Sequence, residues 1–371
     1  MVIRVTKPSI NVREKLAELD RPTGAAGAAM LRAETPQEQF NLINAGRRNL
    51  IINGAMDIWQ RGDTFPSLGS IDTFSADRMH TVAYNLNFAN ATGGQIDRSY
   101  IYGTHLDGVN FSHALKISPS STWKLCYLDQ RVEDVTKFSD VPVTVSYYAR
   151  ANAAVALSVT PRINQMFGSG GSATVATYAD NADIQNLTTD WQRFSYTMHC
   201  PSISGKTVGS GHYADFYIYQ ATDLSAAGWI EITGFQVEYG KIATPFEHRP
   251  LGEELALCQR YYWKYYADST SDGVYAIGQA YSTSEAMCAV ALPTSMRTAP
   301  AVGWTGSSRV RNSTGSSQPV SNLSVQGWSR DAQGTSIVQL KATTSTTNLT
   351  AGHAAQFRVS LNDYIEFKAE L

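Results

Sequence analysis

Hydrophobic side chains recur at every second position over much of the chain, which is the spacing of strands with one buried face. Between about Asn49 and Glu247, short alternating runs are separated by Gly, Asn, Asp and Pro. Many short strands divided by such turn residues predict an antiparallel sandwich. Gly234 interrupts the last of these runs, which predicts a β-bulge at that point. The runs are 143–149, 155–159, 194–200, 216–218 and 230–239.

Residues 249–266 break the alternation and predict a helix that connects two β domains. Pro250 stands at its start, and Glu253 and Glu254 follow in the first turns, where acidic side chains suit the helix dipole. Apolar residues form two stripes on this helix, so we expect it to contact either two domains or two subunits. Residues 267–371 return to strands and Ser/Thr/Gly-rich turns, enough chain for one small β domain. The residues assigned to the helix contact are Leu255, Cys258, Tyr261 and Tyr262.

Residues 1–48 have the pattern of a short helix, a loop and a second short helix. A capping-box pattern precedes each helix, at Asn11 and at Thr35. Two helices this short cannot fully bury their apolar stripes against each other, so they need a partner surface on another copy or another protein. The apolar residues assigned to assembly are Val12, Leu16, Leu19 and Phe40.

Composition restricts the class of protein. Hydrophobic residues make up 43% of the 371 residues, which excludes global disorder. Lys and Arg total 30 against 32 Asp and Glu, so charge gives no argument for nucleic acid or an anionic membrane as partner. Apolar stretches are too short for a membrane span, and the first residues lack the apolar region of a signal peptide. The four cysteines form no C-x-x-C motif, and we expect buried reduced thiols.

Local motifs give no catalytic residue, metal site or cofactor. The Gly-Lys-Thr at Gly205 lacks the first glycine of a phosphate loop and a following helix, so it predicts a hairpin turn. Histidines do not show zinc-binding spacings, and no nucleophile elbow is present. Carboxylate pairs from different strands cannot be recognised by spacing, so an enzyme is neither supported nor excluded. Exposed aromatic rings beside polar groups suit sugars, and the candidate glycan contacts are Trp304, Arg309, Arg311 and Trp328.

Several stretches together resemble the tail fibre and tailspike proteins of bacteriophages, especially those of marine and cyanobacterial phages. An N-terminal segment of this kind is matched by 10–20, 22–24 and 35–39. The start, a middle strand and the finish of a jelly-roll module of carbohydrate-binding type are matched by 48–54, 58–62, 76–78, 190–194, 229–238, 244–247 and 252–262. Residues 364–371 resemble the close of many such fibres.

This resemblance implies a fold and a set of partners. The fold is mainly β: a jelly-roll sandwich over 49–248, the connecting helix, and a C-terminal β domain over 267–371 that carries the receptor-binding tip. The implied assembly is a homotrimer on the virion tail, made in the host cytoplasm and fixed to a tail adaptor or nozzle protein through residues 1–48. The implied ligand is a host surface polysaccharide or lipopolysaccharide, without nucleic acid or membrane insertion.

Two other functions stay open at this point. Tailspikes that cleave glycans usually have a long parallel β-helix, and this chain has neither the length nor the repeat for one, so we expect a binding protein rather than an enzyme. A glycan hydrolase or esterase with its site on the sandwich loops is one alternative. A tail adaptor or decoration protein that binds virion partners alone is the other.

Overall fold

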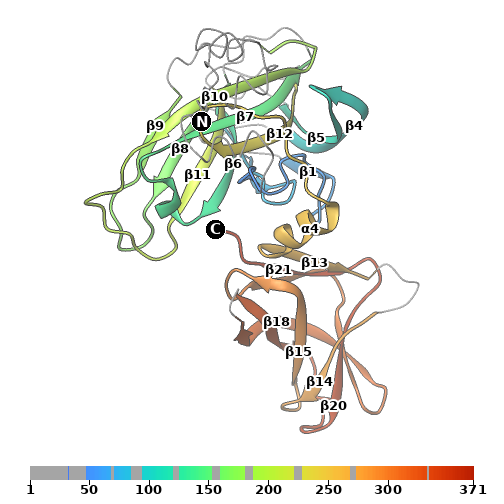
Figure 1. Ribbon diagram of the computed structural model, residues 1–371. Coiled ribbons are helices and arrows are strands. Elements are labelled where there is room, and N and C mark those ends of the chain that lie inside the picture. The colour runs from blue at the N-terminus through green and yellow to red at the C-terminus, as the bar shows by residue number, and fades with distance from the viewer. Residues whose placement is uncertain are drawn as a thin grey trace, which may run out of the picture.

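The computed structural model describes residues 47–371 together with Arg32, except for 68–70, 85–93, 120–124, 153–158, 180–186, 221–227, 268–272 and 332–333. Figure 1 shows two β bodies, with one helix where they meet. The predicted mainly β fold, with a jelly-roll sandwich and a smaller C-terminal β domain, is confirmed. The assembly residues Val12, Leu16, Leu19 and Phe40, and the two N-terminal helices, lie outside the described residues.

The larger body is a jelly-roll sandwich of two six-stranded antiparallel sheets. A short 3-10 helix, η1, spans Val135–Phe138. The first sheet has the order β1 (Thr64–Ser67), β4 (Gly94–Leu106), β5 (Val109–Pro119), β12 (Ile230–Tyr239), β7 (Val141–Ala151) and β10 (Gln192–Cys200). The second has the order β2 (Ile71–Phe74), β3 (His80–Tyr84), β6 (Leu125–Glu133), β11 (Tyr213–Gln220), β8 (Val159–Met166) and β9 (Val175–Tyr178).

The alternating residues that the structure describes point into the sandwich, as the sequence predicts, whereas most of the run 155–159 lies outside the described residues. Val145 and Tyr147 of β7 pack in one core cluster with Leu128 and Phe216 of the opposite sheet, and all are at most 1% exposed. Burying this aliphatic and aromatic surface is the main force that holds the two sheets together. The predicted bulge is present: the register of β12 against β7 shifts between Thr233 and Gln236.

The smaller body is a closed six-stranded barrel with a three-stranded sheet packed against it. In order around the barrel, its strands are β14 (Gly273–Ala280), β15 (Glu285–Met296), β19 (Thr335–Thr344), β18 (Ser317–Arg330), β17 (Arg309–Asn312) and β20 (Ala354–Val359). The three-stranded sheet has the order β13 (Tyr262–Tyr266), β21 (Tyr364–Lys368) and β16 (Ala301–Trp304). Closure leaves the barrel without free strand edges, which protects it from pairing with other chains.

The connecting helix is shorter than the sequence predicts. Helix α4 covers Leu251–Gln259, and β13 starts at Tyr262. The prediction of a helix through residue 266 is therefore wrong. The run from Tyr262 to Tyr266 is rich in aromatic residues, which favour strands, and β21 supplies a partner strand almost a hundred residues later. Pro250 and the acidic first turn do start the helix, as expected.

Side chains from both bodies meet across their junction. Gln60 donates to the Tyr262 carbonyl at 3.0 Å, and Arg61 binds Glu370 at 2.8 Å. The buried Arg78 also reaches Glu370 and stacks on the ring of Tyr261, with 3.6 Å between the guanidinium carbon and the ring centroid. The last residues of the chain therefore hold the barrel against the sandwich.

Candidate functional site

The structure separates the four predicted glycan contacts. Trp304 lies on β16, is half-buried and packs against the barrel core, so its first role is structural. Arg309 and Arg311 share β17, whereas Trp328 is 51% exposed on β18. Arg311 lies opposite Ser317 at the start of β18, and Trp328 follows eleven residues later. At about 3.3 Å per residue that is roughly 35 Å along the strand, so the two arginines and Trp328 cannot touch one sugar ring.

The predicted helix contact residues lie at the junction of the two bodies. Cys258, Tyr261 and Tyr262 are buried, and Leu255 is half-buried. Tyr261 donates to Glu133 of the sandwich, whereas Tyr262 donates to Glu366 of the three-stranded sheet at 2.7 Å. These side chains therefore join the sandwich to the barrel body within one chain. A role between subunits stays a prediction.

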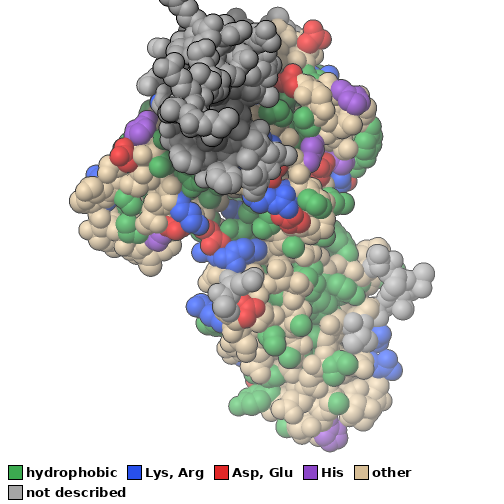
Figure 2. Space-filling model, in the orientation of Figure 1, with side chains coloured by type: hydrophobic (Ala, Val, Ile, Leu, Met, Phe, Trp, Pro, Cys, Tyr) green, Lys and Arg blue, Asp and Glu red, His purple; other side chains and the backbone are tan. Residues whose placement is uncertain are grey.

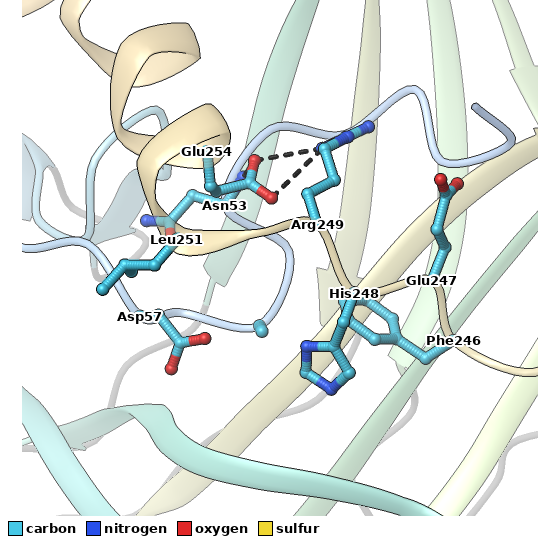
Figure 3. A pocket seen from close by; sticks show the side chains of 9 residues that line it. Asn53, Asp57, Phe246, Glu247, His248, Arg249, Leu251 and Glu254 are labelled. Atoms are coloured by element: carbon cyan, nitrogen blue, oxygen red, sulfur yellow. Dashed lines mark hydrogen bonds and ion pairs between the residues drawn. The ribbon is translucent and has the colours of Figure 1, made fainter. Parts of the chain in front are cut away.

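The small pocket in Figure 3 lies beside the start of α4. Arg249 binds Glu254 at 3.0 Å, and Asp57 and His248 lie on the other side of the space. Its volume is about 50 Å³. Ligand sites commonly measure a few hundred Å³, whereas a space of this size holds a few water molecules. We therefore assign it to water and to the packing of α4.

A larger cleft, of about 430 Å³, opens between the sandwich and the three-stranded sheet. Several of its polar side chains are engaged with one another. Arg61 lies over the ring of Tyr262 and binds Glu370, and Glu366 accepts from Tyr262 and pairs with Lys368 at 2.6 Å. Groups that already satisfy each other have little capacity left for a ligand. In this cleft they hold the two bodies together.

The distal pocket, of about 280 Å³, lies on the outside of the barrel, across the adjacent strands β14, β20 and β17. Gln356 of β20 is opposite Ile277 of β14 on one side and Arg311 of β17 on the other. Ile277 is 66% exposed. The end of the barrel labelled β14 and β20 in Figure 1 is the end farthest from the sandwich. The residues that line the distal pocket are Ile277, Arg311, Asn312, Ser313, Gly315, Ala354, Ala355 and Gln356.

The polar groups of the distal pocket differ in how they are used. Asn312 is fully engaged: its side chain accepts from the amides of Thr314 and Ser316 and so fixes the hairpin between β17 and β18. The side chains of Arg311 and Gln356 make no hydrogen bond or ion pair with another described residue. An apolar side chain beside unused planar donors is the arrangement that suits the apolar face and the hydroxyls of a sugar ring.

Sequence reasoning found Arg311 but missed Ile277 and Gln356. Part of the signal was available: Phe357 and Val359 alternate as core residues, which places Gln356 and Arg358 on the outer face of the same strand. Ile277 gave no signal, because an isolated isoleucine in a strand normally belongs to a core.

A buried acidic cluster lies on the second sheet of the sandwich. Burial, with the charge of Asp129, raises the pKa of Asp215 to about 8. Tyr217 donates to Asp215 at 2.5 Å, and His80 contacts Asp129 at 2.8 Å. Burial alone lowers the pKa of His80, but hydrogen bonds to Asp129 and Asp72 raise it above its ordinary value. Perturbed carboxyls often mark active sites, but Asp129 and Asp215 are at most 2% exposed, so a polysaccharide cannot reach them.

The described part of the chain contains no group of three or more His, Cys, Asp or Glu side chains arranged to hold a metal ion. Cys200, Cys258 and Cys288 are buried and unbonded, as expected of reduced thiols. No helix among the described residues is both long and apolar enough to cross a membrane.

No protein-family model and no curated protein matches the chain. Solved structures that this chain matches include the xylan-binding domain CBM22-1 from Paenibacillus barcinonensis Xyn10C, with 13% identity and a TM-score of 0.29 over 54% of this chain and 100% of that one. TmCBM61 in complex with β-1,4-galactotriose has 11% identity and a TM-score of 0.26 over 52% and 100%. The enzymatically active domain of bacteriophage CBA120 tailspike protein 4 has 12% identity and a TM-score of 0.28 over 52% and 21%. The jelly-roll assignment itself rests on the strand order of this chain.

Proposed function

We propose that this protein is a non-enzymatic glycan-binding subunit of a virion tail, and that the distal pocket of its barrel holds the sugar. One observation carries the proposal. On three adjacent strands, exposed Ile277 stands in line with Gln356 and Arg311, two side chains with no partner among the described residues. Strong donors left unused on a rigid barrel are available to a ligand without rearrangement of the protein.

The position of the pocket fits attachment to a surface. It lies toward the end of the barrel farthest from the sandwich (Figure 1). In the proposed assembly, residues 1–48 bind the tail adaptor and three chains present three such pockets together. Linked weak sites gain affinity because the second and third contacts form at high effective concentration. Light scattering tests this assembly: a mass of three times 40.5 kDa supports the trimer, and a monomer contradicts it.

The sugar-binding test uses the full chain on an array of bacterial surface polysaccharides and lipopolysaccharides. We expect saturable binding to a subset of them. Substituting Arg311→Ala should weaken that binding at least tenfold. Arg330→Ala is the matched control, because Arg330 is an exposed arginine at the other end of the same barrel.

Two results would contradict the proposal. Equal binding by the Arg311→Ala and wild-type chains would remove the distal pocket from the interaction. Absence of binding to every polysaccharide, together with capture on purified tails, would favour the structural adaptor. Release of new reducing ends from a bound polysaccharide would establish an enzyme instead.

A further inference from the structure

The outer face of the barrel carries two glutamines next to Ile277. Gln356 of β20 lies directly opposite Ile277, and Gln279 is two residues further along β14, opposite Ala354. On the other side of β14, Ala289 of β15 lies opposite Ile277. Strand side chains alternate, and the residues that alternate with these belong to the barrel core, so all five side chains lie on the outside.

The two glutamines supply a hydrogen-bonding capacity that Arg311 lacks. A carboxamide offers an acceptor oxygen as well as two donor hydrogens, whereas a guanidinium can only donate. The side chains of Gln279 and Gln356 make no hydrogen bond with another described residue. The face around Ile277 therefore combines an apolar centre with acceptors and donors that the described part of the protein leaves unused.

These groups match the three parts of an acetamido substituent. Its planar trans amide carries an N–H donor on one edge and a carbonyl acceptor on the opposite edge, and a methyl group ends it. Side chains directly opposite on paired strands lie about 5 Å apart, and those two residues apart on one strand lie about 7 Å apart. Gln356 and Gln279 are therefore placed to reach the amide from two sides while its methyl group contacts Ile277. A hydroxyl in the same place would leave the apolar surface of Ile277 in water.

From this arrangement we infer that the ligand of the distal pocket is a glycan that carries acetamido sugars. The amide N–H donates to the side-chain oxygen of one glutamine, the carbonyl accepts from the side-chain nitrogen of the other, and the methyl group rests on Ile277. Arg311 donates to a hydroxyl of the same sugar. This inference rests on the proposed glycan-binding function and adds the substituent of the sugar ring to it.

The test uses calorimetric titration of the full chain with two matched pairs of carbohydrates. Chitotetraose is compared with cellotetraose, which has the same linkages and a hydroxyl in place of each acetamido group. N-acetylgalactosamine on a polyacrylamide carrier is compared with galactose on the same carrier, since acetamido sugars occur in both configurations. We expect the acetamido member of at least one pair to bind about ten times more tightly than its partner. Raising the salt from 50 to 500 mM should leave that preference unchanged, because neither member of a pair is charged.

Variants locate the effect in the pocket. Gln279→Met and Gln356→Met keep the length of the side chain and remove its hydrogen bonds, so each should lower the preference to less than about threefold. Ile277→Thr should do the same, because it removes apolar contact surface. Gln326→Met is the matched control, since Gln326 is exposed on β18, three strands from β14 in either direction around the barrel. All four variants should melt within about 3 °C of the wild-type chain, which separates lost recognition from lost folding.

The outcomes distinguish this inference from the function on which it rests. Equal binding of the two members of each pair, still dependent on Arg311, would overturn the acetamido ligand and retain the glycan-binding pocket. A preference that survives both Gln→Met changes would overturn the assignment of the amide contacts to Gln279 and Gln356. Failure of every carbohydrate to bind, on the array and in both pairs, would overturn the glycan-binding function itself.

Discussion

The sandwich and the barrel use their charged side chains in opposite ways. In the sandwich, several charges are paired and buried: Glu231 binds Arg150 at 2.7 Å and is only 4% exposed. In the barrel, Arg309 and Arg311 stay on the outside without an ion pair to a described residue. On the face of the barrel that Figure 2 shows, most of the surface is uncharged, and charged groups gather where the barrel meets the sandwich. Paired charge therefore stabilises the sandwich, whereas the barrel leaves two arginines unpaired among the described residues, as the proposed binding requires of Arg311.

A second contrast lies in the cores. The sandwich core contains large aromatic and aliphatic side chains, among them Phe138, Phe216 and Phe235. The barrel core is built largely from small residues such as Ala286, Ala342 and Ala355, with Phe357 as a large fully buried member. A narrow barrel has little internal space, so small side chains fill it and a single large ring fills a large share of the space.

The largest expected effect follows from that second contrast. Phe357→Ala should destabilise the barrel by about 4 kcal/mol, because it removes a buried ring from a tightly packed core. Hydrogen exchange read by mass spectrometry should show faster exchange in barrel peptides and unchanged protection in the sandwich. Phe216→Ala is the matched variant and should give the reverse pattern. Equal loss of protection in both bodies would mean that they unfold as one unit.

The next largest effect on stability is expected at the junction between the sandwich and the barrel. Glu370→Ala leaves the buried Arg78 and the partly buried Arg61 without their shared carboxylate, at a cost of about 3 kcal/mol. The two bodies should then unfold in separate steps during urea titration. Glu285→Ala removes a more exposed ion pair and should cost less than about 1 kcal/mol. A single unchanged transition for Glu370→Ala would show that the junction contributes little.

The buried acids of the sandwich predict a dependence on pH. Burial raises the pKa of Asp77 to about 6, partly opposed by Arg61, and raises that of Asp215 to about 8. The unfolded chain loses these protons near pH 4, whereas the folded chain keeps them until pH 6 to 8. The sandwich should therefore become steadily less stable as pH rises from 4 through 8.

This dependence on pH can be measured by urea unfolding at several pH values. The raised pKa of His80 acts in the same direction, because the stability gained from its protonated form is lost as pH rises. Asp215→Asn should flatten the curve, since the amide cannot ionise. A sandwich that became more stable between pH 5 and 8 would contradict the assignment. Hydrogen exchange of barrel peptides, followed over the same pH range, serves as the internal control.

The smallest expected changes in stability come from replacing one arginine in each body. Arg150→Gln should destabilise the sandwich by about 1.5 kcal/mol, because it leaves Glu231 buried without its cation. Arg309→Gln should change the stability of the barrel by less than about 0.5 kcal/mol, because Arg309 makes no ion pair with a described residue. A clear loss of stability for Arg150→Gln and little change for Arg309→Gln, measured by thermal unfolding in the absence of ligand, are the expected result. Equal destabilisation would show that Arg309 has a structural partner.

Much of the fold could be predicted from the sequence, because alternation is a local property. The alternation of Val145 and Tyr147 predicts the buried face of β7, whichever strand lies beside it. Gly234 marks the bulge because its backbone has φ of 63° and a side chain there would collide with Tyr148 and Phe111. Pro250 and the acidic turn mark where α4 begins.

Only the tertiary structure decided which strands pair and which side chains meet, because the sequence of one strand does not specify its distant partner. The strand from Tyr262 to Tyr266 exists because β21 pairs with it. Trp304 is half-buried because β16 packs on the barrel. Ile277, Gln356 and Arg311 meet through the registers of three strands spread over some eighty residues. A shift of one residue in either register would turn one of these side chains inward, so local pattern names the outward residues and long-range register decides which of them share a site.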